Sequence, residues 1–493
     1  MNRILFSIAV FCCLISTHAA LAQSPAYPAG PGQNYPPEVL QKIKDVENHL
    51  AGWVQPPEGA WWGLTERMAY HRLHGLSIAV IHNYKIEWVR AYGWADTATH
   101  RPVTPETLFQ AASISKSLNG VGVLRLVQEH RLDLYADINN YLSTWKFPYD
   151  SLSKGKKISA ANLLSHTAGL SVHGFAGYAH GDSIPDIYQV LDGRRPANSP
   201  AIRSMFEPGL RSEYSGGGVT ISQLMVMEIT HEAYDKYMWQ NVLRPMGMTA
   251  SFYTQPAPED KRSLLATGYR GGGNEVKGKD HIYPEQAAAG LWTNPTDLAR
   301  YIIETQLSYE GRSAKVLSQA MTIQRLTPYV DSNAAMGVFI MSRGGRKYFS
   351  HGGANEGFRS QYYGSLSDGD GVVIMVNSDN GAILSEIVNS VATVYHWKDF
   401  YQPVIKRDTT VAGDILQTYT GSYTVDGDTV RVLKKDQSLW LDVGFDQWQL
   451  HFTSLLNFYM YDDRGDFQFI KEADGRISGI KINNNRIAKR IAD

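Results

Sequence analysis

The apolar pattern of this 493-residue chain changes near residue 400, and this change limits the folds that are open to it. Before that point, apolar runs at 75–82 and 85–94 flank a two-residue turn, which predicts a hairpin of buried strands. Beyond it, short apolar segments alternate with Asp- and Gly-containing turns, which is typical of a small all-β barrel or sandwich. The chain therefore predicts two unlike domains.

Helical spacing and cap residues mark the helices of the first part. A helix is predicted after the Pro-Pro pair at 36–37, and another over about 113–130. Asn294 as the N-cap, Pro295 at the first helical position and Asp297 reaching back predict the start of a third. The apolar residues that share one face of the first helix are Val39, Ile43, Val46 and Leu50.

A buried strand at 371–377 and an apolar-striped helix at 384–397 complete a mixed α+β pattern. In the last part, strands are predicted at 418–423, 429–433, 439–443, 448–452, 457–461 and 466–470. The predicted divisions are a signal peptide at 1–22, a Pro/Gly-rich spacer at 23–37, a mixed domain at 38–399, a linker at 400–413 and a small all-β domain at 414–493.

The first residues are typical of a secretory signal. A basic pair at 2–3 precedes an apolar run at 4–15, and the small-x-small sequence at 20–22 fits a cleavage site; a buried helix is the simpler alternative. Cys12 and Cys13 lie inside this segment and are the chain's two cysteines, so cleavage would leave no thiol for a disulfide, a nucleophile or a zinc site. We expect an exported protein, periplasmic or extracellular, with no membrane span in the mature chain.

Charge and composition exclude some classes of protein. Lys+Arg 47 against Asp+Glu 48 gives a net charge of −1, which argues against a nucleic-acid binder. Apolar residues make up 43% of the chain, which excludes a disordered protein.

Ser113 and Lys116 are the first candidates for chemistry. If Ser113 begins a helix, Lys116 lies one turn further on the same face. A serine hydroxyl is a weak nucleophile until a neighbouring base or cation assists it, and a lysine can do either. A Ser-x-x-Lys pair is common by chance, and on this motif alone a polar helix cap is the simpler interpretation.

Further motifs in the same order strengthen the interpretation. Residues 76–397 resemble the serine β-lactamase and penicillin-binding-protein superfamily, and are most similar to its class C-like branch of esterases, D-amino-peptide hydrolases and DD-peptidases. The 414–493 region resembles the lipocalin-like domain often appended to that branch. The motifs that carry the resemblance are SISK at 113–116, LLSHTAGL at 163–170, YSG at 214–216, the helix entry at 287–300 and HGG at 351–353.

The resemblance implies an antiparallel sheet flanked by helices, with an all-helical lobe, and it implies roles for site residues. Ser113 would be acylated, Lys116 would assist its deprotonation, and Tyr214 would be the general base. A free phenol titrates near about 10, so Tyr214 needs cations nearby, with Lys116 as one and a protonated His351 as another. The backbone N–H groups of Ser113 and Ala354 would form the oxyanion hole.

Other residues near the motifs are candidates for the substrate pocket or for the scaffold around it. Gly352 and Gly353 fit a strand that must approach a substrate closely. His166 is interpreted as structural. Trp292 is a candidate pocket wall, whereas core packing is favoured for three further aromatic residues. These three are Phe175, Tyr178 and Tyr283. Nothing in the sequence requires Glu285 to reach the site.

Two departures from the family pattern argue against efficient hydrolysis of penicillins or cephalosporins. Gly216 stands where the family has an Asn that contacts the acyl side chain, and His351 stands where typical β-lactamases have Lys. We therefore expect an exported serine hydrolase that acts through an acyl-enzyme on small amides, short or D-residue-containing peptides, or esters. The alternatives are a penicillin-recognising sensor that acylates without turnover, or a weak β-lactamase. No metal or organic cofactor is implied, and the oligomeric state stays open.

Overall fold

The computed structural model describes residues 34–425, 428–443, 447–461, 463–483 and 486–491. The predicted signal at 1–22, and the predicted spacer as far as residue 33, lie outside the described residues. The α-helices of the described part are α1 (Pro37–Asn48), α2 (Leu64–Tyr70), α3 (Ser115–Gln128), α4 (Ala160–Leu164), α5 (Ile187–Asp192), α6 (Gly216–Thr230), α7 (Tyr234–Met238), α8 (Gln286–Ala289), α9 (Pro295–Tyr309), α10 (Gln319–Arg325), α11 (Ala382–Val394) and α12 (Gly413–Tyr419). Shorter turns of helix are η1 (Ala112–Ile114), η2 (Ile138–Asn140), η3 (Ser151–Ser153), η4 (Trp239–Leu243) and η5 (Glu259–Leu264).

The strands fall into one large sheet, a barrel and three short pairs. In the mixed domain they are β1 (Val54–Gln55), β2 (Gly75–His82), β3 (Lys85–Asp96), β4 (Arg101–Pro102), β5 (Phe109–Gln110), β6 (Tyr178–Ala179), β7 (His281–Ile282), β8 (Trp292–Thr293), β9 (Ala334–Ala335), β10 (Val338–Arg343), β11 (Arg346–Asn355), β12 (Phe358–Ser365) and β13 (Gly371–Val376). The remaining strands are β14 (Val404–Ile405), β15 (Gly421–Val425), β16 (Asp428–Lys435), β17 (Ser438–Asp442), β18 (Gln447–Phe452), β19 (Asn457–Met460), β20 (Asp463–Lys471), β21 (Ile477–Ile482) and β22 (Arg486–Arg490).

The large sheet is antiparallel and has the order β4-β3-β2-β13-β12-β11-β10-β9. Helices cover both of its faces, so every residue of the central strand β13 is buried, and β2 is buried from Gly75 to Ile81. In β2, Ile78 and Val80 face a cluster that includes α1 and α11, whereas Ala79 and Ile81 face the cluster that includes α3, α6 and α9. Side chains of a strand alternate between its two faces, but in β2 both faces are buried. The sequence of β2 therefore shows a nearly continuous apolar run instead of an alternation of apolar and polar residues.

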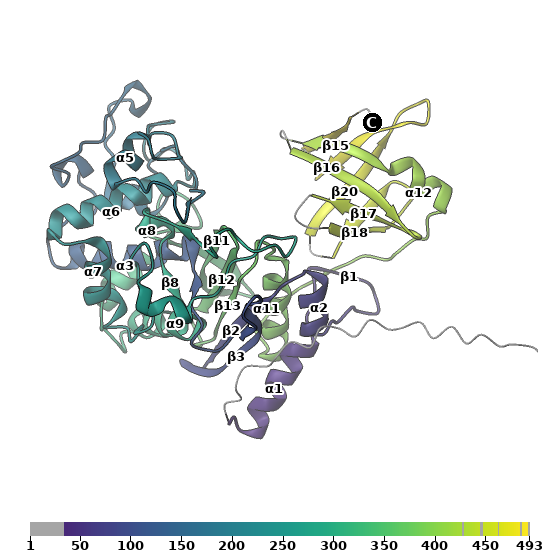
Figure 1. The fold of residues 1–493 in the computed structure, drawn as a ribbon, viewed down its shortest axis with the longest axis horizontal. Helices are drawn as coiled ribbons and strands as arrows, with labels where there is room; N and C mark the ends of the chain where they lie inside the picture. The colour runs from purple at the N-terminus through teal and green to yellow at the C-terminus, as the bar shows by residue number, and fades with distance from the viewer. Residues whose placement is uncertain (1–33, 426–427, 444–446, 462, 484–485, 492–493) are drawn as a thin grey trace, which may run out of the picture.

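A helical lobe stands beside the sheet, as Figure 1 shows for α3, α5, α6, α7 and α8. Helix α3 packs against α6, α8 and α10, and nearly all of its side chains are buried. Its first turn lies where the lobe meets strand β11, because η1 contacts β11 directly. This junction between sheet and lobe holds the residues predicted for the site.

Most elements of the mixed domain follow the sequence pattern. The predicted hairpin is confirmed as β2 and β3, and the first helix as α1, with Val39, Ile43 and Val46 buried. The helix predicted from Ser113 begins one element later, since Ser113 lies in the turn η1 and α3 starts at Ser115. The whole is a mixed domain of helices around an antiparallel sheet, followed by a closed barrel.

The barrel closes with eight antiparallel strands, two more than the six that the pattern predicts. Strands β21 and β22 were missed because their sequences, ISGIKI and RIAKR, hold a central glycine or many charges. Gly479 belongs there because a Cβ on it would lie 2.6 Å from the Ala488 carbonyl oxygen of the neighbouring strand. Helix α12, at Gly413–Tyr419, was not predicted, and it takes the first two residues of the strand predicted at 418–423.

The connector between the two domains is more ordered than predicted. Val404 and Ile405 form β14, which pairs in parallel with β1 of the mixed domain. Val54 donates a hydrogen bond of 3.0 Å to the carbonyl oxygen of Tyr461 in the barrel segment, and the Arg464 guanidinium lies 4.0 Å from the Trp53 ring centre. The barrel is therefore tied to the edge that the connector forms with β1.

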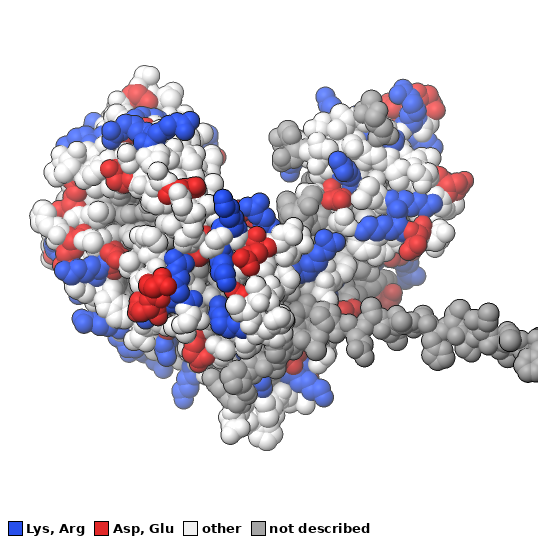
Figure 2. All heavy atoms as spheres, in the orientation of Figure 1, with Lys and Arg blue, Asp and Glu red and all other residues white. Residues whose placement is uncertain are grey.

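The visible surface mixes basic and acidic side chains over both domains, as Figure 2 shows. This distribution agrees with the balanced charge of the chain. Within the described residues, every helix is too short or too polar to cross a bilayer.

Candidate active site

The nucleophile candidate and its lysine meet at the start of α3. Lys116 Nζ donates to Ser113 Oγ at 3.0 Å and to the Ala288 carbonyl oxygen, at the end of α8, at 2.8 Å. The lysine is 3% exposed, whereas Ser113 is partly exposed. A buried amine is thus held by a backbone carbonyl from a distant helix, within hydrogen-bonding distance of an accessible hydroxyl.

Tyr214 brings the third predicted group to the same place. Its ring centre lies 5.0 Å from Lys116 Nζ, and the side chain is partly exposed. The residue stands just before α6, whose N-cap Ser215 accepts a hydrogen bond from the Gly218 N–H at 2.9 Å. The helix entry therefore aims Tyr214 at the Ser113–Lys116 pair, which the linear sequence separates from it by about a hundred residues.

An aromatic cluster surrounds Tyr214. The His166 ring centre lies 4.3 Å from that of Tyr214, and the Phe339 ring stacks on both at 6.2 and 6.5 Å. His166 Nδ1 accepts a hydrogen bond of 3.2 Å from the Ser215 N–H. His166 thus holds the Tyr214–Ser215 segment, in line with the structural role expected for it. No local signal marks Phe339 as a member of this site, because the β10 register brings it there.

His351 does not supply the second cation that the sequence suggested. Burial, and then the charge of Lys116, lower the pKa of His351 to about 3, so the ring is neutral near pH 7. Its Nδ1 lies 2.6 Å from the Gly352 carbonyl oxygen and donates to it. Among the described residues its buried Nε2 finds no partner. Burial likewise lowers the pKa of His166 well below its usual value, which leaves Lys116 as the cation beside Tyr214.

Strand β11 places the predicted oxyanion donor. Residues 351–355 pair with β12 on one side, whereas the β10 ladder ends at Ser350, so the other edge of this stretch is open to the site. A two-residue turn closes the hairpin between Asn355 and Phe358, and ladder alternation then turns the Ala354 N–H away from β12. Ala354 is exposed, as an oxyanion donor requires.

Gly353 is required for a different reason from the one expected. A Cβ on it would collide with the Ala111 carbonyl oxygen and with Ser360 Oγ, which are atoms of the chain itself. Ser360 Oγ donates to that same carbonyl at 3.1 Å. The glycine thus lets β11 lie against the segment before Ser113, which brings the two predicted oxyanion donors together. At Gly352 a Cβ would meet the end of the Gln361 side chain at 2.9 Å.

Trp292 lies in the core in this structure. Its side chain is fully buried, its ring packs edge to face on Phe358 at 5.7 Å, and it belongs to the short strand β8. Trp292 is therefore not the open pocket wall that the sequence suggested. Its strand β8 pairs with β5 and leads into α9. Tyr178 and Tyr283 are also buried, whereas Phe175 is partly exposed.

A family model described as Beta-lactamase matches residues 64–386 of the chain, which is more than half of it. The chain belongs to the β-lactamase family. The match contains every residue placed at the candidate site above, including Ser113, Lys116, Tyr214 and His351.

Relatives and solved structures agree with this family. Protein flp of Staphylococcus aureus (strain N315) is 23% identical over 355 residues, which cover 71% of this chain and 67% of that protein. The octameric penicillin-binding protein homologue from Pyrococcus abyssi has a TM-score of 0.61 at 19% identity, covering 86% of this chain and 98% of that one. The D-amino acid amidase from Ochrobactrum anthropi SV3 has a TM-score of 0.55 at 19% identity, covering 73% and 98%. At these identities the structures show the fold of the β-lactamase family, and the family supports a hydrolase.

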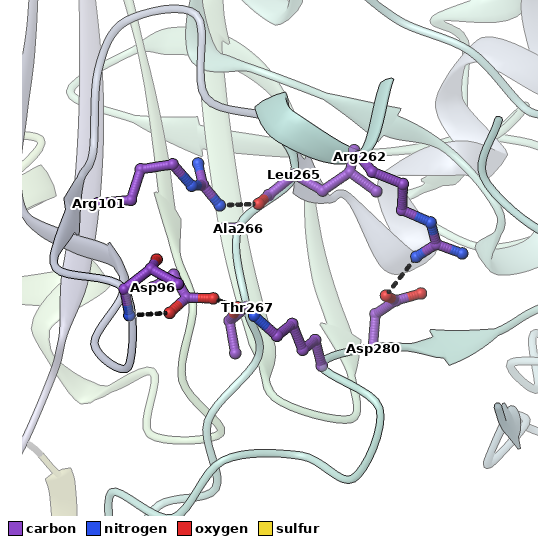
Figure 3. A pocket seen from close by; sticks show the side chains of 9 residues that line it. Asp96, Arg101, Arg262, Leu265, Ala266, Thr267 and Asp280 are labelled. Atoms are coloured by element: carbon purple, nitrogen blue, oxygen red, sulfur yellow. Dashed lines mark hydrogen bonds and ion pairs between the residues drawn. The ribbon is translucent and has the colours of Figure 1, made fainter. Parts of the chain in front are cut away.

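A cavity of about 290 Å³ lies away from the β-lactamase-family centre, and none of the site residues lines it. Figure 3 shows its charged side chains bonded among themselves or to the backbone. Arg262 pairs with Asp280 at 3.2 Å, Thr267 donates to Asp96 at 2.9 Å, and Lys279 also pairs with Asp96. The charged side chains that line this cavity are thus paired with one another or with the backbone, as the Arg101 bond to the Leu265 carbonyl oxygen also shows.

Proposed function

We propose that the protein is an exported serine hydrolase that forms an acyl-enzyme on Ser113. The observation that carries the proposal is the hydrogen bond of 3.0 Å between Lys116 Nζ and Ser113 Oγ, beside the Tyr214 ring. Buried ionisable groups next to an accessible hydroxyl are the arrangement that nucleophilic catalysis needs. The export part of the proposal is supported by the signal-like pattern at residues 1–22.

The reaction would proceed in two halves. Ser113 Oγ attacks the substrate carbonyl while its proton passes to the Lys116–Tyr214 pair, and the N–H groups of Ser113 and Ala354 hold the oxyanion. The leaving amine or alcohol takes the proton, and the acyl group stays on Ser113. A water molecule then attacks the ester, one proton returns to Ser113, and the free acid leaves.

Small amides, short or D-residue-containing peptides, and esters are the proposed substrates. The likeness to a D-amino acid amidase supports this class. Gly216 and the neutral His351 remove two polar groups that bind β-lactam antibiotics in typical family members, which favours hydrolysis of other acyl groups. The alternative function is a penicillin sensor that is acylated without turnover. The missing side chain at Gly216 is the feature that favours this alternative.

One assay separates these functions. The protein is incubated with a short-chain p-nitrophenyl ester, with D-alanine p-nitroanilide and with a penicillin. We expect turnover of the ester or the anilide, abolished in Ser113→Ala. Stoichiometric penicillin labelling of Ser113 with no turnover of any substrate would replace the hydrolase with the sensor. Absence of both turnover and labelling would reject the acyl-enzyme altogether.

A further inference from the structure

The ring of Phe175 lies against Gly216, two residues after Tyr214 in the chain. A Cβ placed on Gly216 would lie 3.1 Å from Phe175 Cε2, 3.5 Å from its Cδ2 and 3.2 Å from the His173 carbonyl oxygen. Nonbonded carbon atoms prefer separations of about 3.5–4.0 Å, so a side chain at position 216 would have to displace the ring. Phe175 therefore occupies the space that such a side chain needs.

The segment that carries Phe175 is fixed to the residues around Tyr214. The Gly216 N–H donates to the His173 carbonyl at 3.2 Å, and the Gly217 N–H donates to the Val172 carbonyl at 3.0 Å. His173 Nδ1 lies 2.5 Å from the Tyr214 carbonyl oxygen. These three bonds hold residues 172–173, just before Phe175, against residues 214–217. The position of the ring therefore depends on that of Tyr214.

The ring is positioned to meet both core and substrate. Phe175 is partly exposed, and it packs both against the large apolar cluster of the domain and against Gly216, which is two residues from Tyr214. Since residue 216 has no side chain, this patch of the wall offers a ring edge and no hydrogen-bonding side-chain group. An amide brought against it would lose water without gaining a partner.

We propose that Phe175 is a specificity-determining residue, which makes the acyl-binding wall apolar and selects acyl groups with an apolar substituent over those with an acylamino group. The inference rests on the proposed function, because it takes Ser113 as the acylated residue. An unpaired amide typically costs roughly ten- to a hundredfold in an equilibrium or rate ratio. The preferred substrates are thus esters or amides of simple apolar acids rather than of N-acylated amino acids.

The test compares two esters with the same leaving group and the same chain length. These are p-nitrophenyl pentanoate and p-nitrophenyl N-acetylglycinate, each corrected with the Ser113→Ala protein. We expect the wild type to favour pentanoate in kcat/KM. In Phe175→Ala/Gly216→Asn, the ring is removed and an amide side chain takes its space. The ratio of kcat/KM values should then move toward N-acetylglycinate by about tenfold or more.

Single variants separate the effect of the Phe175 ring from a general loss of structure. Phe175→Leu keeps an apolar wall, so its ratio should stay within about twofold of the wild type. Gly216→Asn alone should lose activity on both esters, because the ring remains in place. Phe175→Ala alone lets water reach the wall, so it should shift the ratio in the same direction as the double variant. It replaces the double variant in the test if that protein does not fold. Thermal unfolding of each variant monitors folding.

The outcomes distinguish this inference from the proposed function. An unmoved ratio in a folded Phe175→Ala or double variant that still hydrolyses both esters overturns the role of Phe175 alone. A rise in the N-acetylglycinate share in Gly216→Asn equal to that of the double variant also overturns it, since the ring would then not exclude the side chain. Failure of an alkyl fluorophosphonate to label Ser113 in the wild type, with no ester turnover, overturns the proposed function itself.

Discussion

The two domains differ in what they bury. The described part of the barrel has a core of apolar and aromatic side chains, such as Phe469 and Tyr423, and its buried residues include none that is charged. The mixed domain buries Lys116, Glu285 and Arg325 almost completely. Burying an ionisable group costs free energy unless it is paired. The mixed domain thus carries the cost of burying ionisable groups, and the residues proposed for the chemistry lie there, whereas the described part of the barrel buries apolar and aromatic side chains.

Ser113→Ala should have the largest effect. Loss of the nucleophile removes the acyl-enzyme route and should lower kcat by about 10⁴-fold or more, while leaving the unfolding temperature nearly unchanged. Ester turnover and calorimetry measure both quantities. Ser151→Ala, at an exposed serine of η3, is the control and should keep full activity. Equal rates for the two variants would break the assignment of chemistry to this junction.

Phe469→Ala should damage the barrel and spare the chemistry. The ring is fully buried, stacks on Tyr419 with centres 4.3 Å apart, and contacts Phe458 at 4.8 Å. Its removal should cost about 3–5 kcal/mol of barrel stability, visible as a lowered unfolding transition. Turnover of a small ester at 25 °C should persist. A parallel loss of ester turnover would show that the barrel contributes to the site.

Glu285→Gln should change how stability depends on pH. Burial raises the pKa of Glu285 to about 8, and its two carboxyl oxygens have no partner among the described residues. The ordinary pKa of a glutamate carboxyl is 4.5, so wild-type stability should fall as pH rises from 4.5 to about 8, because folding must then take up a proton.

Urea unfolding at pH 5.5 and pH 8 measures this dependence. The wild type should lose on the order of a few kcal/mol between the two values, and Glu285→Gln should lose much less. Glu259→Gln, at a side chain 95% exposed, should behave as the wild type does. Identical slopes for wild type and Glu285→Gln would show that this carboxyl is ionised in the folded protein.

Arg464→Ala tests the tie between the domains and should have the smallest effect. Its guanidinium lies over the Trp53 ring, and it donates to the Gln402 carbonyl at 3.1 Å. Partly exposed cation–π contacts contribute about 0.5–1 kcal/mol, so a slight loss of coupling between the two unfolding transitions is expected. Arg476→Ala, on an exposed barrel turn, should leave that coupling intact; an equal effect of both would remove the role of Arg464.

Local chemistry in the sequence was enough for several elements. Asn294 caps α9 as predicted, accepting from the Asp297 N–H at 2.9 Å, because a cap joins residues three apart. The Asp297 side chain does not reach back, however; it accepts from the Ala250 and Ser251 N–H groups of a distant loop. Local partners were thus predicted correctly, and the distant partners of the same residue were not.

The Ser113–Lys116 pair could be predicted from the amino-acid sequence, since two residues three positions apart at the start of a helix share a face, and so could the division into a mixed and an all-β domain. Tertiary structure alone decided that Ala288 holds Lys116, that Phe175 fills the space beside Gly216, and that β21 and β22 close the barrel. The physical reason is range: caps and faces depend on residues three or four apart, whereas neutral His351, buried Trp292 and the wall beside Tyr214 depend on which distant segments exclude water from one another.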